Sequence, residues 1–318
     1  MATSISITNT RAADQAANTG PRPFAPLDYL LYALTVASWS VSWYALALQP
    51  GMVANEVSLT YRFVIAALIM LAWVSVTGQP MRFPLRQHAI FAAMGVCIFS
   101  TNFLLFYYGS SYLVSGLLSV VFSLASLANM LLAALIFGEK PSARIIGAAL
   151  LGVAGIGLLF WPETASRGFG DGVLTGLGLC IAGTLCFSTG SLISSRMQGR
   201  TTGQRVPLVS TNTWGMIYGA IWCCFLAIIQ GEPFNWDPRP EYAYSLIFLA
   251  VVSTVVAFAA YLTLVGRIGS GRAGYATVVF PVFALLVSTV FEDYRWTLFA
   301  VVGLGLVAVG NIIVMRGR

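Results

Sequence analysis

Apolar stretches of about twenty residues recur along the chain, and short polar segments rich in Gly and Pro separate them. A helix of about twenty apolar residues crosses the roughly 30 Å hydrocarbon core of a bilayer and satisfies its own backbone hydrogen bonds there. Each stretch therefore predicts one membrane-spanning helix. The predicted helices number ten, at about 28–48, 57–77, 88–107, 112–137, 142–161, 172–195, 206–230, 242–265, 271–291 and 295–315.

One of these stretches has a counterpart later in the chain. Ser115 to Ser123 aligns with Ala273 to Pro281 at an offset of 158 residues, and an acidic residue, Glu139 or Glu292, follows each run. This self-similarity predicts a tandem duplication. We expect a first five-helix repeat at 28–161 and a second at 172–315. Before them we expect a disordered cytoplasmic tail at 1–27, which lacks the apolar core of a signal peptide.

Composition agrees with a membrane protein. Hydrophobic residues make up 58% of the chain and charged residues 9%, whereas about a quarter of a soluble domain is charged. The net charge is +6, but Lys and Arg stand one to three at a time between apolar runs. That spacing governs membrane topology and does not indicate a nucleic-acid-binding patch.

The positions of Lys and Arg also predict the orientation. With a cytoplasmic N-terminus, the inside segments hold most of the basic residues, and the outside loops hold only Arg167, Arg239 and Arg295. Both termini are therefore predicted to be cytoplasmic. Because each repeat has an odd number of helices, the second is predicted to be inverted. The fold class is then all-α integral membrane, with two inverted five-helix repeats and a substrate site near the midplane.

Several short motifs resemble a known family. They are Trp39-Ser40, Tyr61-Arg62-Phe63, Phe137 to Pro141, Arg267 to Ala273, and Phe280 to Phe283. In order and spacing, over about residues 30 to 315, the chain resembles the drug/metabolite transporter superfamily. Within it, the chain is similar to the ten-helix EamA-like branch, which includes amino-acid exporters of the YddG type. The resemblance implies export of metabolites. The family usually has a proline where this chain has Ser123, so the two halves need not bend equally.

Pro281 stands near the middle of the ninth predicted helix. A proline removes the hydrogen bond to the carbonyl four residues back, so we expect a free carbonyl at Thr277 that accepts from a substrate. The alternative is a kink that serves packing only. In the fourth helix we expect a smaller perturbation, in which Ser123 donates to the carbonyl of Ser119.

Charge inside the predicted membrane region is sparse. Arg62 is the basic residue that lies well inside an apolar run, with Glu56 as a candidate partner, and it is either a structural clamp or a contact to a substrate carboxylate. Glu139 and Glu292 are expected to form salt bridges at helix ends with Lys140 and Arg295 and are candidates for gating. No other Lys or Arg lies at depth, and Arg62 itself is placed near the outer mouth, which disfavours phosphate-bearing substrates.

Titratable groups for proton transfer or catalysis are also few. No Asp or Glu occurs in mid-helix, and His88, the only histidine, lies at the start of the third helix, so we predict no side-chain proton relay. The five cysteines fall inside apolar runs without metal-like spacing, and no cofactor or metal is predicted. An integral-membrane enzyme is disfavoured because no general base or metal site is found.

Aromatic rings and small polar groups are what the predicted interior offers a substrate. A cavity of this kind suits uncharged or zwitterionic compounds with apolar side chains, although aromatic residues also face lipid and hydroxyls also join helices. The candidate substrate-binding residues are Trp39, Trp43, Asn102, Tyr107, Ser119, Phe122, Phe187, Ser188, Tyr261, Thr277 and Phe280.

The function predicted from these features is transport across a bacterial inner membrane. We expect export of small metabolites, above all hydrophobic or aromatic amino acids, by alternating access around a midplane cavity, with facilitated rather than proton-driven movement. Sugars, purines and other uncharged metabolites are the alternative substrates, and a selective pore is the alternative class. A monomer is expected because the duplicated chain already contains both halves.

Overall fold

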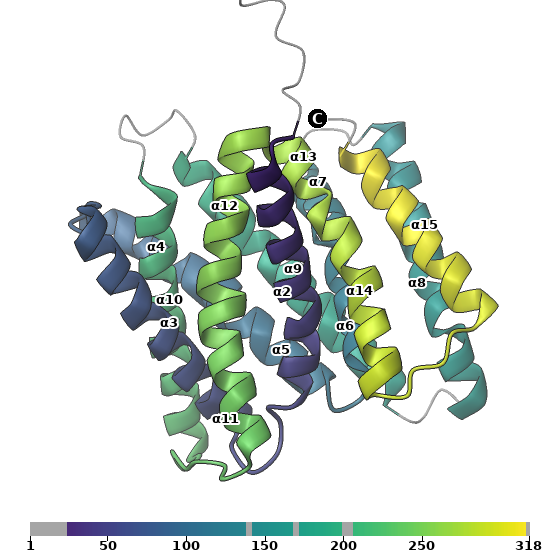
Figure 1. The fold of residues 1–318 in the computed structure, drawn as a ribbon, viewed down its shortest axis with the longest axis horizontal. Coiled ribbons are helices and arrows are strands. Elements are labelled where there is room, and N and C mark those ends of the chain that lie inside the picture. Colours follow the sequence, from purple (N-terminus) through teal and green to yellow (C-terminus); the bar gives the residue numbers. More distant parts are fainter. Residues whose placement is uncertain (1–23, 138–141, 168–171, 199–205, 316–318) are drawn as a thin grey trace, which may run out of the picture.

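The computed structural model describes residues 24–137, 142–167, 172–198 and 206–315. In these residues all regular secondary structure is helical, and ten helices are long and apolar enough to cross a membrane. This confirms the predicted class and the predicted number of crossings. The crossings lie side by side in one bundle (Figure 1). We call the end of the bundle where the first crossing begins and the last one ends the terminal pole, and the opposite end the far pole.

The first five crossings are each continuous or broken once or twice. Crossing one is α2 (Pro26–Ala47) and crossing two is α3 (Asn55–Thr77). Crossing three comprises α4 (Leu85–Val96), η1 (Cys97–Thr101) and α5 (Asn102–Gly109). Crossing four comprises α6 (Ser115–Ser123) and α7 (Ala125–Phe137), and crossing five is α8 (Ala143–Arg167).

The second five crossings follow the same order of continuous and broken helices. Crossing six is α9 (Val173–Gln198) and crossing seven is α10 (Leu208–Gln230). Crossing eight comprises α11 (Pro240–Ile247), η3 (Phe248–Val256) and α12 (Ala257–Ile268). Crossing nine comprises α13 (Ser270–Gly274) and α14 (Ala276–Phe291), and crossing ten is α15 (Leu298–Met315).

Matching features occur in the two sets of five. Crossings three and eight both contain a π-helical segment, an arrangement that is rare and concentrated at functional sites. Crossings two and seven both end at a glycine with positive φ, Gly78 at 64° and Gly231 at 72°. Glycine adopts this conformation without strain and thereby lets the next N–H cap the helix. These likenesses agree with the predicted duplication, whose inverted arrangement stays a prediction.

Crossing four differs from what the sequence led us to expect. α14 continues through Pro281, whereas crossing four, which has no proline, is interrupted at Leu124. There the N–H of Leu124 bonds the Val121 carbonyl, three residues back, and the turn tightens. The prediction that Ser123 donates to the Ser119 carbonyl is wrong, because its hydroxyl reaches the nearer Val120 carbonyl at 2.7 Å.

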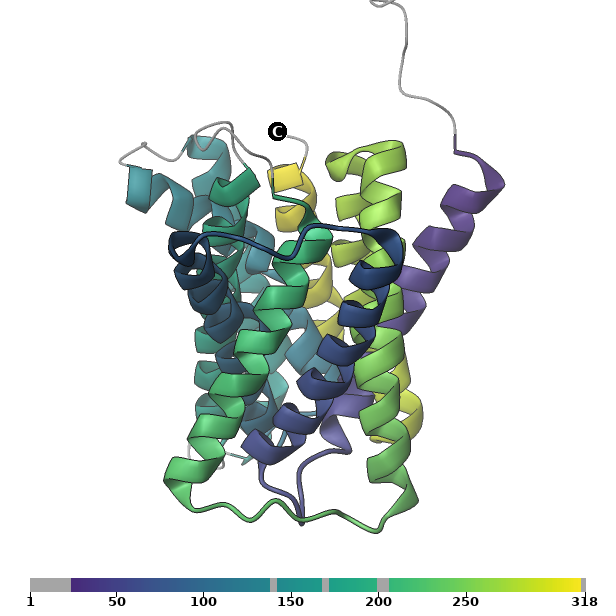
Figure 2. The same cartoon turned by 90° about the vertical axis from the view of Figure 1, so that its left-hand side faces the viewer.

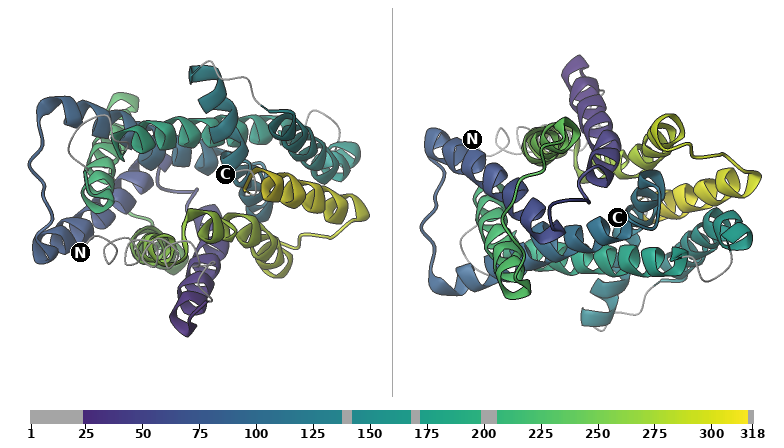
Figure 3. Two further views of the ribbon diagram at one scale, coloured as in Figure 1. Left: turned by 90° about the horizontal axis from the view of Figure 1, so that it is seen from above. Right: turned by 90° about the horizontal axis from the view of Figure 1, so that it is seen from below.

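Close helix packing positions the crossings around the centre of the bundle. α8 packs along α15, and α3 packs along α10 at the opposite end of the elongated bundle (Figure 3). A methyl group on Gly155 of α8 would lie 2.6 Å from the Gly303 carbonyl oxygen of α15, so only glycine permits this approach. Between these two pairs, α2 packs against α12 and α14, and α9 packs against α5, α6 and α7.

Candidate functional site

A cavity of about 340 Å³ lies in the middle of the bundle. Crossings one to four, six and eight to ten all contribute residues to its wall. The wall reaches from Leu46 and Arg62, toward the far pole, to Gly274 and Met315 at the terminal pole. The cavity therefore extends along much of the length of the helices, from one pole toward the other, and is shared by both halves of the chain.

Nine of the 25 residues on the cavity wall are aromatic. Trp39 of α2 packs against Tyr261 and Phe280, with ring centroids 5.1 and 6.2 Å apart. One helical turn further on, Trp43 contacts Phe122 at 5.4 Å and lies parallel to Phe280 at 6.4 Å. The i,i+4 spacing places both indoles on one face of α2, as the sequence indicated.

Arg62 supplies the only charge among the described residues that line this cavity. Its side chain is 2% exposed, and its guanidinium carbon lies 4.3 Å from the ring centre of Phe103. Nη2 donates to Thr254 Oγ1 at 3.2 Å, whereas Nε and Nη1 have no hydrogen-bond partner. Tyr107 lies beside the guanidinium, but its hydroxyl also lacks a hydrogen-bond partner. A buried guanidinium with unused donors is costly in free energy unless a partner satisfies them.

One expectation about Arg62 is wrong. Its partner is not Glu56, whose carboxylate instead accepts from the Tyr108 hydroxyl and from Gln230 Nε2, the latter at 3.3 Å. α3 begins at Asn55 and carries Arg62 two turns into the bundle, onto the part of the cavity wall toward the far pole. Its burial and free donors weaken the stated reason for disfavouring phosphate-bearing substrates.

Amide and hydroxyl groups gather on the wall nearer the terminal pole. Asn311 of α15 accepts from Ser126 Oγ at 2.6 Å and donates to Ser123 Oγ at 3.4 Å. Asn129, one turn after Ser126, lines the cavity with its Oδ1 atom buried and without a hydrogen-bond partner. The sequence analysis did not name Asn129 or Asn311 as site residues, although a polar amide inside an apolar membrane helix often indicates a functional position.

Most predicted binding residues lie on the cavity wall. They are Trp39, Trp43, Phe122, Phe187, Tyr261, Thr277 and Phe280. The remaining candidates are not on the wall: Asn102 donates to the Ile98 carbonyl, Ser119 to that of Gly116 and Ser188 to that of Ala125, while Tyr107 is fully buried. The wall also includes Phe103, Phe258, Ser126, Ser191 and Asn129. Contact of any of these residues with a substrate stays a prediction.

Of the predicted gating residues, Glu292 lies at the far pole between the two halves. Its carboxylate accepts from the backbone N–H of Ser115 at 3.1 Å and from the hydroxyls of Ser115 and Ser288, both at 2.5 Å. The expected salt bridge with Arg295 is not formed, because Glu292 instead caps the first turn of α6. Pro281 is buried in α14 next to the cavity residue Phe280. Glu139 lies outside the described residues.

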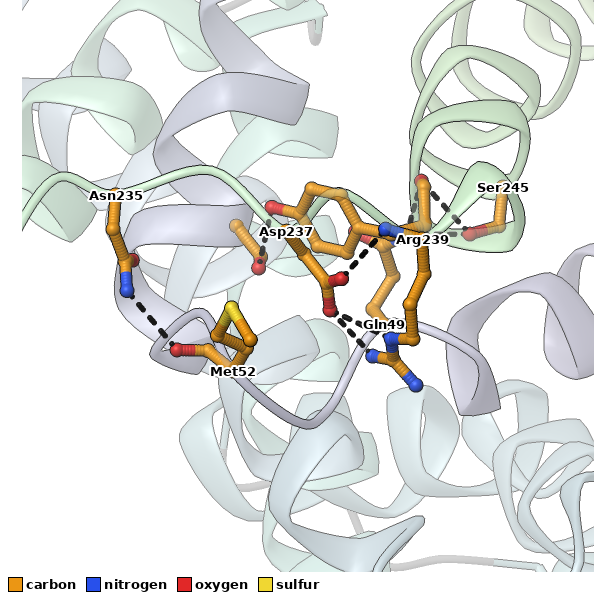
Figure 4. Close-up of polar contacts among 8 residues, drawn as sticks. Gln49, Met52, Asn235, Asp237, Arg239 and Ser245 are labelled. Carbon is orange, nitrogen blue, oxygen red and sulfur yellow. Dashed lines mark hydrogen bonds and ion pairs between the residues drawn. The ribbon is translucent and has the colours of Figure 1, made fainter.

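Loops from the two halves also meet at the far pole. The connection between α10 and α11 runs across this pole and meets the α2–α3 loop (Figure 2). Gln49 Nε2 donates to the Tyr242 carbonyl at 3.1 Å and to Ser245 Oγ at 2.5 Å, and Asn235 Nδ2 donates to the Met52 carbonyl at 3.2 Å (Figure 4). Together with the Glu292 network, these contacts form what we call the far-pole seal.

A charged pair stabilises one of these loops. Arg239 donates to Asp237 from Nε at 2.8 Å and from its backbone N–H at 2.9 Å, and the ion pair spans 2.6 Å (Figure 4). These hydrogen bonds hold the pKa of the Asp237 carboxyl below its usual range, because they favour the charged form. The Asp237 side chain is fully buried, whereas that of Arg239 is half exposed.

A ten-crossing membrane bundle around an aromatic cavity has the architecture of a small-molecule transporter. The model of the EamA-like transporter family matches residues 27–161 and 174–316, and the chain therefore belongs to the EamA-like transporter family. This family assignment confirms the resemblance found in the sequence. It makes the protein a multi-pass membrane transporter of the drug/metabolite kind and points away from an enzyme.

Relatives agree with the family. An "Uncharacterized transporter" of Haemophilus influenzae is 23% identical, with 92% of this chain and 93% of that protein covered. An "Uncharacterized transporter" of Archaeoglobus fulgidus is 21% identical, with 91% and 99% covered. A solved crystal structure shares the fold with a TM-score of 0.62 at 18% identity, covering 90% of this chain and 95% of that chain.

Proposed function

We propose that the protein exports hydrophobic or aromatic amino acids, with the substrate carboxylate bound by Arg62. The observation that carries the proposal is the buried guanidinium on the cavity wall, whose Nε and Nη1 are unpaired. Neighbouring guanidinium N–H groups match the two oxygens of a carboxylate and form two parallel hydrogen bonds with it. No acidic side chain stands among the described wall residues, so the substrate itself would supply the missing negative charge.

The rest of the wall suits the other parts of such a substrate. The faces of Trp39 and Trp43 can bind an ammonium group by cation–π attraction, which requires no acidic residue. The rings of Phe122, Phe187 and Phe280 offer an apolar surface for a hydrophobic side chain. A volume of about 340 Å³ lies at the lower end of the range for small-molecule sites. Sugars and purines would leave the guanidinium unpaired, which makes them the weaker alternative.

Transport by this cavity requires access from each side in turn. The far-pole seal closes one end, while the cavity reaches Gly274 and Met315 at the other. With both termini in the cytoplasm of a bacterial inner membrane, as the basic residues predict, this arrangement accepts substrate from the cytoplasm. We propose that the halves at 28–161 and 172–315 then rock within a monomer to break the seal. Without a side-chain proton relay, the movement follows the substrate's own gradient.

Uptake into proteoliposomes tests this function. Purified protein is given a panel of amino acids, sugars and purines, with and without a pH gradient. We expect saturable uptake of Leu, Phe or Trp at a rate that does not depend on the pH gradient. Arg62→Met, which keeps the length but removes the charge, should lower kcat/KM by about a hundredfold or more, since loss of a buried charged hydrogen-bonding group costs several kcal/mol.

Two matched variants separate binding from folding. Arg62→Lys keeps the charge without the planar fork and should recover part of the activity. Thr254→Val removes the hydroxyl that accepts from Nη2 and should have a much smaller effect than Arg62→Met. Uptake of sugars or purines alone, unaffected by Arg62→Met in a variant with a normal melting temperature, would contradict the proposal. Flux that does not saturate would indicate a pore.

A further inference from the structure

A second polar group lies on the cavity wall, away from Arg62. We propose that Asn129 selects substrates that carry a hydrogen-bond donor at the far end of their apolar body, such as a phenolic hydroxyl. This inference rests on the proposed function, because it takes the carboxylate to be bound at Arg62. It adds a specificity-determining contact for the opposite end of the substrate.

The reason lies in how the neighbouring polar groups are used. Asn311 binds both Ser126 and Ser123 from behind the wall, so these hydroxyls have protein partners. Ser123 also donates to the Val120 carbonyl at 2.7 Å. Asn129 Oδ1 is left as a buried acceptor without a hydrogen-bond partner. Buried carbonyl oxygens are nearly always satisfied, and an unsatisfied one on a cavity wall indicates a donor that arrives with the ligand.

The packing of the helices gives the separation between the two polar groups. The Arg62 guanidinium lies over Phe103, and Phe103 belongs to the same crossing as Ile98, five residues earlier. The level of Ile98 is also that of Gly190 in α9, where an added Cβ would lie 2.5 Å from the Ile98 side chain. Ser188 in turn donates to the Ala125 carbonyl, one turn before Asn129. Ser188 lies two residues nearer the far pole than Gly190, so the whole path amounts to a net seven residues. At a rise of about 1.5 Å per residue, Arg62 and Asn129 stand roughly 10 Å apart along the bundle, and any sideways separation adds to this distance.

That separation selects the position of the donor on the substrate. After allowing about 2.9 Å for each hydrogen bond, roughly 4–5 Å remains along the bundle between the two polar ends of the ligand, and the sideways separation adds to it. This is more than the roughly 3 Å between the carboxylate and the ammonium of one α-amino acid head group. One aromatic ring between the carboxylate end and a hydroxyl bridges the gap. Phe122 and Phe187, whose ring centroids lie 4.8 Å apart, provide apolar packing for that ring on the same wall.

Paired substrates that differ by one hydroxyl test the inference. Binding of tyrosine and phenylalanine is measured from the fluorescence of the cavity tryptophans, and uptake from competition in proteoliposomes. We expect the wild-type protein to prefer tyrosine by about threefold to tenfold, the usual effect of one satisfied hydrogen bond. Asn129→Leu should abolish this preference while phenylalanine binding stays within about twofold of the wild-type value.

A matched control removes another buried amide. Asn102 also has an Oδ1 atom without a hydrogen-bond partner, but it does not line the cavity, so Asn102→Leu should keep the tyrosine preference. Asn129→Ala serves as a second variant where the leucine variant melts early. Equal affinity of the wild-type protein for the two amino acids, or a preference that survives in both Asn129 variants, would overturn the inference.

The failure of the proposed function is distinguishable from the failure of this inference. Where neither amino acid binds, 3-phenylpropionate and its 4-hydroxy analogue provide the same hydroxyl difference without an ammonium group. A hydroxyl preference that depends on Asn129 in this pair would uphold the inference and refute only the amino-acid assignment. No binding of either acid, or equal binding of both, would overturn the inference as well.

Discussion

The polar groups of the far-pole seal are hydrogen-bonded to one another, whereas some polar groups of the cavity wall have no hydrogen-bond partner. In the seal, the Glu292 carboxylate accepts three hydrogen bonds, and Ser288 Oγ also accepts from the N–H of Gly116 at 2.7 Å. On the wall, Arg62 leaves two nitrogen atoms unpaired and Asn129 leaves its carbonyl oxygen unpaired. Buried polar groups that satisfy one another hold two helices together, whereas buried groups left unsatisfied are available to a ligand. We expect this difference to separate residues that close the protein from residues that contact the substrate.

The largest effect is expected at the seal. Glu292→Ala removes the acceptor of the Ser115 N–H and of two hydroxyls between α6 and α14. Hydrogen bonds to charged groups contribute about 1.5–3 kcal/mol each, so the seal should open at least about tenfold more often. Amide hydrogen exchange followed by mass spectrometry should show this as faster exchange in 115–123 and 285–292.

The control for the seal is a carboxylate outside it. Glu241 is exposed in the first turn of α11, and Glu241→Ala should leave exchange at 115–123 unchanged. Exchange rates in Glu292→Ala that match the wild-type rates would show that the network does not limit opening of the far pole. The inference that paired polar groups hold the far pole closed would then be wrong.

A smaller effect is expected on the aromatic wall. Trp39→Ala removes ring contacts with Tyr261, Phe258 and Phe280 and exposes part of the site to water. Aromatic contacts contribute about 0.5–1.5 kcal/mol each, so KM for an aromatic amino acid should rise about threefold to tenfold while kcat changes little. Trp73, which is 50% exposed on α3, is the matched control, and Trp73→Ala should leave KM unchanged. Equal effects of both variants would place the substrate elsewhere.

The smallest effect is expected in the far-pole loop. The lowered pKa of Asp237 means that its charged form stabilises the fold at every pH above its ordinary pKa of about 4, and that this stabilisation is lost as pH falls through the lowered value. Asp237→Asn should therefore lower Tm at neutral pH by no more than about 2 °C, because Arg239 is half exposed. Melting curves of both proteins should converge in acid. A constant difference at every pH would assign the effect to packing.

Hydrophobic patterning predicted the crossings well for a simple reason. A backbone in hydrocarbon must bond to itself, so an apolar run of sufficient length has no choice but a helix. The pattern did not predict the interruptions. The π segment at 248–256 and the break at Leu124 lie inside long, mainly apolar runs, where the residues alone do not distinguish a regular helix from an irregular one.

The site residues likewise divide into those that the sequence predicted correctly and those that it did not. Trp39, Trp43, Phe122 and Phe280 were found because large rings at helical spacing must fill the space between helices, and here they surround the cavity. Ser119 and Ser188 were expected beside them, but their hydroxyls bond to nearby carbonyls instead. A short hydroxyl side chain meets a carbonyl within its own turn so often that its presence in a helix says little about a ligand.

The sequence by itself determined that this chain has ten membrane-spanning helices and that aromatic rings stand in its interior. These properties follow from local composition and spacing, which act on each helix separately. Only the tertiary structure decided which polar groups are paired. Arg62 and Glu292 both stand in or beside apolar runs, yet one has unpaired donors on a cavity and the other accepts three hydrogen bonds. Pairing depends on side chains brought from other helices, and no single stretch of sequence contains them.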